Sequence, residues 1–397
     1  MRFLLATLTA LFQLALPAFA DTSDLWDLAA LEQPVPFHWQ QQKGPIHSLL
    51  YEGESYRGKK TEVFAFYASP STLNPSASKP VAGYPAVVLI HGGGGTAFAD
   101  WVYLWAKRGY AAIAMDLAGK RPQDPVWAGE GDQRAPQHLP KAEDRTALPN
   151  GGIDHGHPEK FDSISSPDKH DHWPFHAVAN VIRAHTLIRG LAEVDENHTA
   201  VTGISWGGYT TCLVASVDHR FKAAVPVYGC GFLFEGESVQ KPAIDKLGAN
   251  RERWIELYDP SSHLANCRIP VLFVNGTNDV HYPLDSYQKS FDRVPDGQKL
   301  MRIQVKMGHG HPPGWAPKEI GLFIDTYCRD GEPLPQPGKP EIVNGEIKLA
   351  YASKHPIQKA QLHYTTDGGK RSERQWQSVE AVVTESGITV QAPPAEA

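Results

Sequence analysis

The sequence has little cysteine, little excess charge of either sign and no long apolar run. Four cysteines occur in 397 residues, and none of them forms the C-x-x-C spacing of zinc or redox sites. They allow three complete disulfide pairings, among which the sequence does not choose. The net charge of −6, with no basic cluster, is unlike that of nucleic-acid-binding proteins. We therefore expect no nucleic acid partner, and an uncharged or weakly polar substrate fits better than a polyanion.

The apolar run near the N-terminus is too short to cross a bilayer. Residues 3–16 follow the positively charged Arg2 and precede an A-x-A motif at residues 18–20. This arrangement is typical of a cleaved secretory signal, and no cysteine follows the cleavage site to carry a lipid. We expect residues 1–20 to be removed, the mature protein to be secreted or periplasmic, and no membrane insertion after cleavage.

Apolar runs of strand type alternate with segments of helical period from about residue 60 to residue 330. This alternation predicts an α/β fold with a mostly parallel sheet flanked by helices. The clearest strands are expected at residues 86–90, 111–115, 200–202, 223–227, 271–274 and 301–305. The clearest helices are expected at residues 98–108, 176–189, 284–294 and 317–328.

Two segments, residues 120–173 and 233–263, do not follow this alternation of strands and helices. Each follows the end of a strand, where open α/β sheets bind their ligands, so we expect both to wall the active site. Four prolines between residues 333 and 340 then indicate a stiff linker. Alternating polar and apolar residues beyond it predict a small β-sandwich-like module over residues 338–397. The catalytic domain is accordingly expected over residues 21–332.

The most informative stretch is Gly203-Ile-Ser-Trp-Gly207, which fits the G-x-S-x-G pattern. It lies between a run of strand type and a run of helix type, which is the setting of a nucleophile elbow. Glycines allow the two elements to approach closely, and the following helix directs its first amides at the serine. We therefore predict Ser205 as the nucleophile and the amide of Trp206 as a donor to the oxyanion.

Two further loops follow predicted strands and offer partners for the serine. The glycine run after His91 can turn the amides of Gly92 and Gly93 toward a carbonyl oxygen, which completes an oxyanion hole. Asp279 follows the strand that ends at residue 274, and its carboxylate can orient a histidine. The alternative is that Asn278 orients the histidine and Asp279 belongs to a turn.

The base is expected in the segment Met307-Gly-His-Gly-His311, which follows the last strand. Two histidines compete here, and only one can reach Ser205 productively. We favour His311, which lies deeper in the loop and fits a G-x-G-H turn, over His309 as second choice. The other histidine would then face the substrate or support the site.

Histidine and aspartate are dense in the first insertion, at residues 154–157 and 168–176. Such residues can converge on a metal ion. The competing interpretation is a polar loop over the mouth of the site, and we favour it because a serine triad needs no metal. We expect no metal and no cofactor.

The order of glycine loop, serine, aspartate and histidine is that of α/β-hydrolases. More narrowly, residues 203–209, 221–228, 276–279 and 310–314 resemble secreted members of the dienelactone hydrolase, prolyl oligopeptidase and acetyl xylan esterase group. The resemblance covers roughly residues 60–330. It implies an α/β-hydrolase fold and hydrolysis of an ester, or less often an amide, through an acyl-serine intermediate.

From these features we expect a secreted serine esterase that acts on a small molecule or, most specifically, removes acetyl groups from an acylated carbohydrate. A peptidase or amidase of the prolyl oligopeptidase type is the alternative within enzymes. Only about 40 residues precede the first strand, which is too few for the β-propeller found in such peptidases. The alternative from another class is a non-catalytic carbohydrate-binding protein on a hydrolase scaffold.

Overall fold

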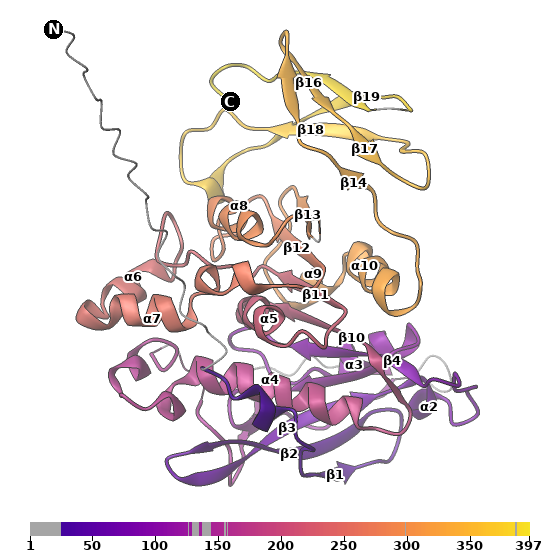
Figure 1. The fold of residues 1–397 in the computed structure, drawn as a ribbon, viewed down its shortest axis with the longest axis vertical. Helices are drawn as coiled ribbons and strands as arrows, with labels where there is room; N and C mark the ends of the chain where they lie inside the picture. Colours follow the sequence, from indigo (N-terminus) through magenta and orange to yellow (C-terminus); the bar gives the residue numbers. More distant parts are fainter. Residues whose placement is uncertain are drawn as a thin grey trace, which may run out of the picture.

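A nine-stranded sheet runs through the larger part of the molecule (Figure 1). The structure is a computed structural model that describes residues 25–125, 127–128, 135–136, 144–154, 156, 158–297, 299–385 and 387–397. The signal expected at residues 1–20 therefore lies outside the described residues. In spatial order the strands are β1 (Phe37–Gln41), β2 (His47–Tyr56), β3 (Lys59–Ala68), β5 (Ala111–Met115), β4 (Tyr84–Ile90), β10 (Val194–Ile204), β11 (Ala223–Val227), β12 (Val271–Gly276) and β13 (Lys299–Gln304).

From β5 to β13 in this spatial order, each strand pairs parallel with the next, whereas the pairs β1–β2, β2–β3 and β3–β5 are antiparallel. The central strands β4, β5, β11 and β12 are buried along almost their whole length, which explains their nearly unbroken apolar sequences. All six strands expected from the sequence are confirmed. The sequence does not single out the first three strands, and in β1 and β2 exposed or half-buried residues interrupt the apolar pattern.

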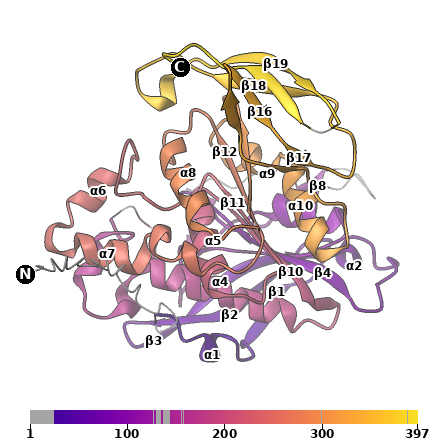
Figure 2. The same ribbon diagram turned by 45° about the horizontal axis from the view of Figure 1, so that its top comes forward.

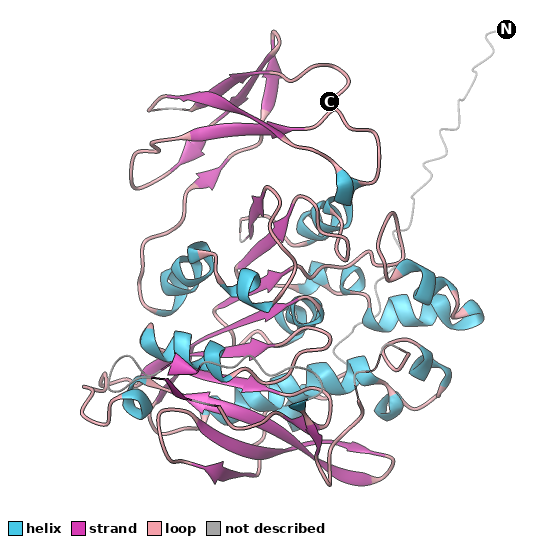
Figure 3. Ribbon diagram, turned by 180° about the vertical axis from the view of Figure 1, so that it is seen from behind, coloured by secondary structure: helices cyan, strands magenta, loops and turns pink. Residues whose placement is uncertain are grey.

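Helices cover both faces of the sheet (Figure 3). Helices α3 (Ala99–Lys107) and α10 (Lys318–Cys328) pack on one face, where Arg108 bonds to Asp325. Helices α4 (Trp173–Arg189), α5 (Trp206–Val217) and α8 (Leu284–Arg293) cover the other face. All four expected helices are confirmed, and α4 starts at Trp173 because proline is well tolerated in a first helical turn.

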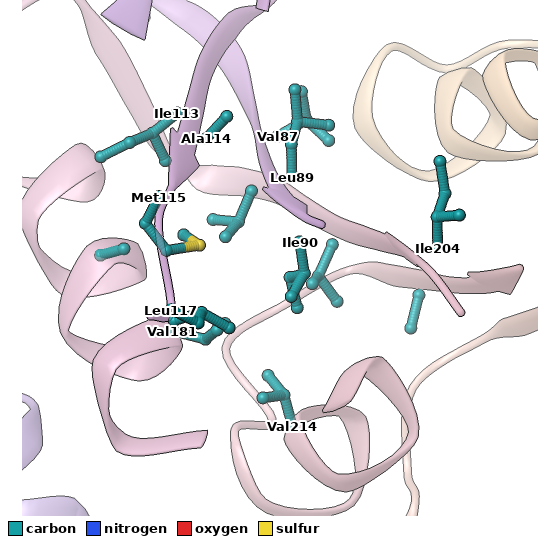
Figure 4. Packing of buried hydrophobic residues seen from close by; sticks show 14 of the residues in the cluster. Val87, Leu89, Ile90, Ile113, Ala114, Met115, Leu117, Val181, Ile204 and Val214 are labelled. Atoms are coloured by element: carbon teal, nitrogen blue, oxygen red, sulfur yellow. The ribbon is translucent and has the colours of Figure 1, made fainter. Parts of the chain in front are cut away.

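The core lies between the sheet and these helices. Side chains of β4 and β5, such as Ile90 and Met115, meet Val181 of α4 and Val214 of α5 in one apolar cluster (Figure 4). All four of these side chains are fully buried. A rigid sheet packed in this way fixes the loops that follow its strands, and these loops carry the predicted site residues.

The two insertions contain mostly short elements. In the first, the structure describes β6 (Lys120–Arg121), β7 (Trp127–Ala128), β8 (Ala135–Pro136), β9 (Thr146–Ala147), η4 (Asp162–Ser165) and η5 (Lys169–Asp171). The second contains α6 (Lys241–Asp245), η6 (Gly248–Asn250), α7 (Arg251–Tyr258) and η7 (Pro260–Ser262). Shorter helices elsewhere are α1 (Leu28–Leu31), α2 (Pro70–Leu73), η8 (Leu264–Asn266) and α9 (His311–Trp315).

The C-terminal part forms antiparallel strands, as the sequence predicts. Strands β15 (Glu341–Val343), β16 (Glu346–Leu349), β20 (Ile388–Gln391), β19 (Gln377–Val383) and β18 (Ala360–Tyr364) make one five-stranded sheet. Strand β14 (Gln336–Pro337) pairs with β17 (Tyr351–Ala352), and η9 (Arg371–Glu373) lies between β18 and β19. We call residues 336–397 the C-terminal module. It lies over the part of the main sheet formed by β12 and β13 (Figures 1 and 2).

Within the described part of the chain, no helix has the length and apolar character needed to cross a membrane. All four cysteines fall in this part, and each is a buried free thiol. Burial raises the pKa of the Cys267 thiol to about 11, so this group is a neutral, unreactive part of the core at ordinary pH.

Candidate active site

Ser205 lies at the sharp turn between strand β10 and helix α5. Its backbone has φ 59° and ψ −117°, a left-handed conformation that a non-glycine residue rarely adopts. Its amide donates to the carbonyl of Val227 on the neighbouring strand at 2.8 Å, which holds the turn in this conformation. The turn is therefore a nucleophile elbow in its backbone geometry as well as in its sequence.

The glycines on either side of Ser205 are required by close backbone contacts. A Cβ atom on Gly203 would lie 2.2 Å from the carbonyl oxygen of Gly207. A Cβ atom on Gly207 would lie 2.0 Å from the carbonyl oxygen of Ile90, at the end of β4. Helix α5 can approach the two strands so closely only because both positions lack a side chain.

Ser205, His309 and Asp279 form one chain of hydrogen bonds. The Nε2 atom of His309 is 3.0 Å from the Oγ atom of Ser205, and its Nδ1 atom is 2.6 Å from Oδ2 of Asp279. The side chain of Asp279 is fully buried, whereas that of His309 is 22% exposed. A buried carboxylate thus orients an imidazole that solvent and substrate can reach, which is the arrangement that activates a serine.

The loop after β12 holds Asp279 in place. Its Oδ1 atom accepts hydrogen bonds from the amides of His281 and Tyr282, both at 2.8 Å, which leaves Oδ2 for His309. The side chain of Asn278 instead faces the C-terminal module, where it donates to main-chain carbonyl oxygens. The structure therefore places Asp279, and not Asn278, against the histidine.

The structure corrects the expectation that His311 is the histidine that reaches Ser205. The Nε2 atom of His311 instead accepts a hydrogen bond from the amide of Gly92 at 3.0 Å. Its ring packs against Phe98, with ring centroids 4.5 Å apart, at the start of α9. His309 lies in the loop after β13, whereas His311 is the first residue of α9, and their positions in the sequence alone do not determine which ring faces the serine.

The glycine loop between β4 and α3 is fixed from several sides. His91 accepts from the amide of Leu117 at 2.9 Å through Nε2, so its Nδ1 carries the proton that it donates to the carbonyl of Gly92 at 2.7 Å. Arg145 of the first insertion donates to the carbonyl of Gly95. The loop is therefore a fixed turn, and not a flexible glycine segment.

The predicted oxyanion donors are the amides of Gly92, Gly93 and Trp206. The amide of Gly92 is engaged by His311. Gly93 lies against the ring of Trp206, where an added Cβ would be 2.8 Å from Cδ1. Trp206 is the first residue of α5, and the amide of a first helical residue has no carbonyl partner within its own helix. Gly93 therefore packs against Trp206, the residue that directly follows Ser205.

Aromatic rings surround His309. Its ring centroid lies 4.6 Å from that of Tyr228 and 4.5 Å from that of His281. Burial, and secondarily the neighbouring His309, lowers the pKa of His281. The hydroxyl of Tyr282 is buried beside Ser205 and makes no well-formed hydrogen bond among the described residues. The sequence indicates His281 and Tyr282 only by their position, because they follow Asp279 within the same loop.

The first insertion reaches the site through a lysine and aromatic rings. The Nζ atom of Lys160 lies 5.1 Å from the ring centroid of Trp173 and 5.3 Å from that of Trp206. Burial lowers the pKa of Lys160 to about 8. Nothing in the sequence singles out Lys160, since a single lysine in a long polar loop carries no signal. The first insertion therefore contacts the ring of Trp206, the residue that follows Ser205.

Among the described residues, no group of three or more histidine, cysteine, aspartate or glutamate side chains is arranged to hold a metal ion. His155 and His157 of the histidine-rich insertion lie outside the described residues. His172 instead contacts the Tyr258 hydroxyl through Nδ1 at 2.6 Å, and His176 donates through Nε2 to the carbonyl of His170 at 2.7 Å. These two histidines therefore support the packing of the insertion against α4 and α7.

The chain is similar to known hydrolases. Residues 146–320, which include the serine, aspartate and both histidines, match the Prolyl oligopeptidase family. Among solved structures, acetyl xylan esterase from Paenibacillus sp. R4 is similar with a TM-score of 0.56 and 20% identity, over 77% of this chain and 94% of that one. Acetyl xylan esterase 1 from Thermoanaerobacterium sp. JW/SL YS485 gives a TM-score of 0.51 and 17% identity, over 79% and 94%. At these identities the likeness concerns the fold, and it confirms the expected α/β-hydrolase architecture.

Proposed function

We propose that this chain is a serine hydrolase of the α/β-hydrolase superfamily and, more specifically, a secreted esterase that removes acetyl groups from carbohydrates. The observation that carries the proposal is the hydrogen-bonded chain Ser205, His309 and Asp279, at 3.0 and 2.6 Å. The acetyl xylan esterases to which the fold is similar support the substrate class. Secretion rests on the signal expected at residues 1–20.

In the first half of the reaction, Ser205 Oγ attacks the acyl carbon and His309 Nε2 takes the hydroxyl proton. Asp279 holds the other ring nitrogen in its protonated form and stabilises the imidazolium that results. The negative charge that develops on the carbonyl oxygen is stabilised by the amides of Gly93 and Trp206. His309 then gives its proton to the departing sugar oxygen, and the acyl group remains on Ser205.

In the second half, water attacks the acyl-serine ester. His309 takes a proton from the water as the new bond to the acyl carbon forms, and the same two amides stabilise the oxyanion. The proton passes to Ser205 Oγ as its ester bond breaks, and the carboxylic acid leaves. The exposed edge of the His309 ring allows the water to approach while Asp279 stays buried.

A peptidase or amidase is the second candidate, and the match to the Prolyl oligopeptidase family favours it. Esters and amides are cleaved by the same triad, so the two candidates differ only in the leaving group that the site accepts. A non-catalytic carbohydrate-binding protein is the third candidate. All three triad residues are present and within hydrogen-bonding distance, which argues against it.

The test gives purified protein p-nitrophenyl acetate, acetylated xylan and aminoacyl anilides side by side. We expect acetate release from the first two substrates, and Ser205→Ala should lower kcat by about 10³-fold or more. Ser76→Ala removes an exposed serine that is distant in sequence from Ser205, and it is the matched control. Full activity in Ser205→Ala would refute the nucleophile, and cleavage of anilides alone would establish the peptidase. Absence of turnover on all three substrates would favour the binding protein.

A further inference from the structure

The C-terminal module makes direct contact with the loop that carries Asp279. The side-chain nitrogen of Asn278, the residue before Asp279, donates to the carbonyl oxygens of Arg374 at 2.8 Å and Ser372 at 3.1 Å. It also lies 3.5 Å from the carbonyl oxygen of Arg371. Carbonyl oxygens can only accept, so the amide nitrogen must be the atom that faces them. We call residues 371–375 the brace segment.

The brace segment is itself anchored to the catalytic domain by charge. The amide of Arg371 donates to Oε2 of Glu237 at 2.9 Å, and its guanidinium lies 3.3 Å from Oε1 of the same residue. The guanidinium also lies 3.6 Å from Asp285, in the first turn of α8. Glu237 belongs to the second insertion, so the brace segment joins that insertion, α8 and the loop of Asp279.

The brace segment also contacts the loop that precedes the proposed base, His309. Gln375 accepts a hydrogen bond from Nζ of Lys306 at 2.7 Å, three residues before His309. The amide of Lys306 donates to the hydroxyl of Thr277 at 3.0 Å, and that hydroxyl donates to Oδ1 of Asn278 at 2.7 Å. The loops of the acid and of the base are therefore tied to each other and to one segment of the module.

We propose that Asn278 and Arg371 are positioning residues through which the C-terminal module holds Asp279 against His309. The proposal rests on the proposed function, because it concerns the same triad. Asp279 is fixed on one side by the amides of residues 281 and 282, and the brace segment fixes the other side. The carboxylate can keep its 2.6 Å contact with His309 only while both sides are held.

The test compares Asn278→Ala and Arg371→Ala with the unaltered full chain on p-nitrophenyl acetate. Gln361→Ala is the matched control, since Gln361 pairs with Glu380 on exposed strands of the same module. We expect kcat to fall about tenfold or more in both brace variants, with KM nearly unchanged, because a small misplacement of a catalytic group slows the reaction strongly. The control should keep its kcat.

The pH profile separates positioning from a general loss of structure. Asp279, His281, Tyr228, Tyr282 and His311 are the titratable groups that face His309, and among them only Asp279 directly follows the residue that the brace segment binds, Asn278. A displaced carboxylate stabilises the imidazolium less, so the acid limb of kcat/KM should move to lower pH in both variants. A merely less stable protein would keep the position of this limb.

Arg371→Lys provides a second measurement if Asn278→Ala does not fold. The lysine keeps the positive charge beside Glu237 and should recover part of the activity lost in Arg371→Ala. Unchanged kcat and an unchanged acid limb in folded Asn278→Ala and Arg371→Ala would overturn the proposal. Ser205→Ala is measured in parallel: activity that survives in that variant refutes the proposed function itself, whereas an inactive Ser205→Ala with unaffected brace variants refutes only the brace.

Discussion

The ring of His311 holds the main chain of Gly92. Its Nε2 atom accepts the amide hydrogen at 3.0 Å, so this nitrogen must be unprotonated. Burial, and secondarily His309, lowers the pKa of His311 to about 4, so the ring stays neutral and keeps this bond at ordinary pH. Two histidines on one loop therefore do different things: His309 reaches Ser205, and His311 fixes the turn whose next amide, that of Gly93, we propose as an oxyanion donor.

This division predicts different losses in His309→Ala and His311→Ala. Removal of the base should lower kcat on p-nitrophenyl acetate by about 10²- to 10⁴-fold. Removal of His311 leaves the triad intact and loosens the glycine loop, so we expect a smaller loss, about tenfold. His219→Ala, which removes an exposed histidine at the end of α5, should match the unaltered protein. A larger loss in His311→Ala than in His309→Ala would show that the histidine roles are reversed.

The sequence predicts the main elements well because the signals are local. Buried parallel strands such as β4 and β11 are continuous apolar runs, and the elbow at Ser205 needs glycine at fixed offsets. The choice between His309 and His311 is different. Both follow the last strand within a few residues of each other. Which ring faces Ser205 depends on the contacts of His311 with Gly92 and Phe98, more than 200 residues earlier in the sequence.

The brace segment shows the same limit of sequence reasoning. The sequence indicates Asn278 only as an alternative to Asp279 for orienting the histidine, with Asp279 then in a turn. Its partners are the main-chain carbonyl groups of residues 371, 372 and 374, so no particular residue type in the sequence indicates this contact. Lys160 was missed for a related reason, since the rings of Trp173 and Trp206 meet around it only in the folded chain.

Asp279→Asn should retain the fold and lose most activity. An asparagine keeps an oxygen for the amides of His281 and Tyr282, but its NH₂ group would face Nδ1 of His309. The ring would then carry its proton on Nε2 and could not take the proton of Ser205, so we expect kcat to fall by about 10⁴-fold. The measurement is kcat on p-nitrophenyl acetate together with circular dichroism.

The control for this variant is Asp292→Asn, which changes an exposed carboxylate on α8. It should leave kcat unchanged. If Asp279→Asn kept even a tenth of the activity, the orienting role would have to belong to another residue.

Gly207→Ala should destabilise the protein strongly. The added Cβ would lie 2.0 Å from the carbonyl oxygen of Ile90, and neither the strand nor the helix can move without opening the elbow. Overpacking of this kind costs about 3 kcal/mol of unfolding free energy. Urea denaturation followed by tryptophan fluorescence measures the change. Gly368→Ala, where nothing lies within 4 Å of an added Cβ, should change the midpoint little, and equal stability of the two variants would contradict the close contact.

Stability should fall on mild acidification because two buried histidines stay neutral in the folded protein. Burial lowers the pKa of His263 to about 4, and the same holds for His311. In the unfolded chain a histidine has a pKa of about 6.5, so below this pH the unfolded state binds protons that the folded state does not. The stabilisation is therefore complete above pH 6.5 and is lost progressively toward pH 4, by up to about 3 kcal/mol for each ring.

Urea denaturation at several pH values between 7 and 4 tests this linkage, and His263→Gln isolates one of its contributors. His263 donates through Nε2 to the carbonyl of Leu257 at 3.0 Å, and the amide of glutamine can donate to the same oxygen without titrating. Between the two pKa values, one histidine contributes a slope of about 1.4 kcal/mol per pH unit. The variant should lose this part of the slope and keep the part that belongs to His311. An undiminished slope in a folded His263→Gln protein would show that other groups control the acid stability.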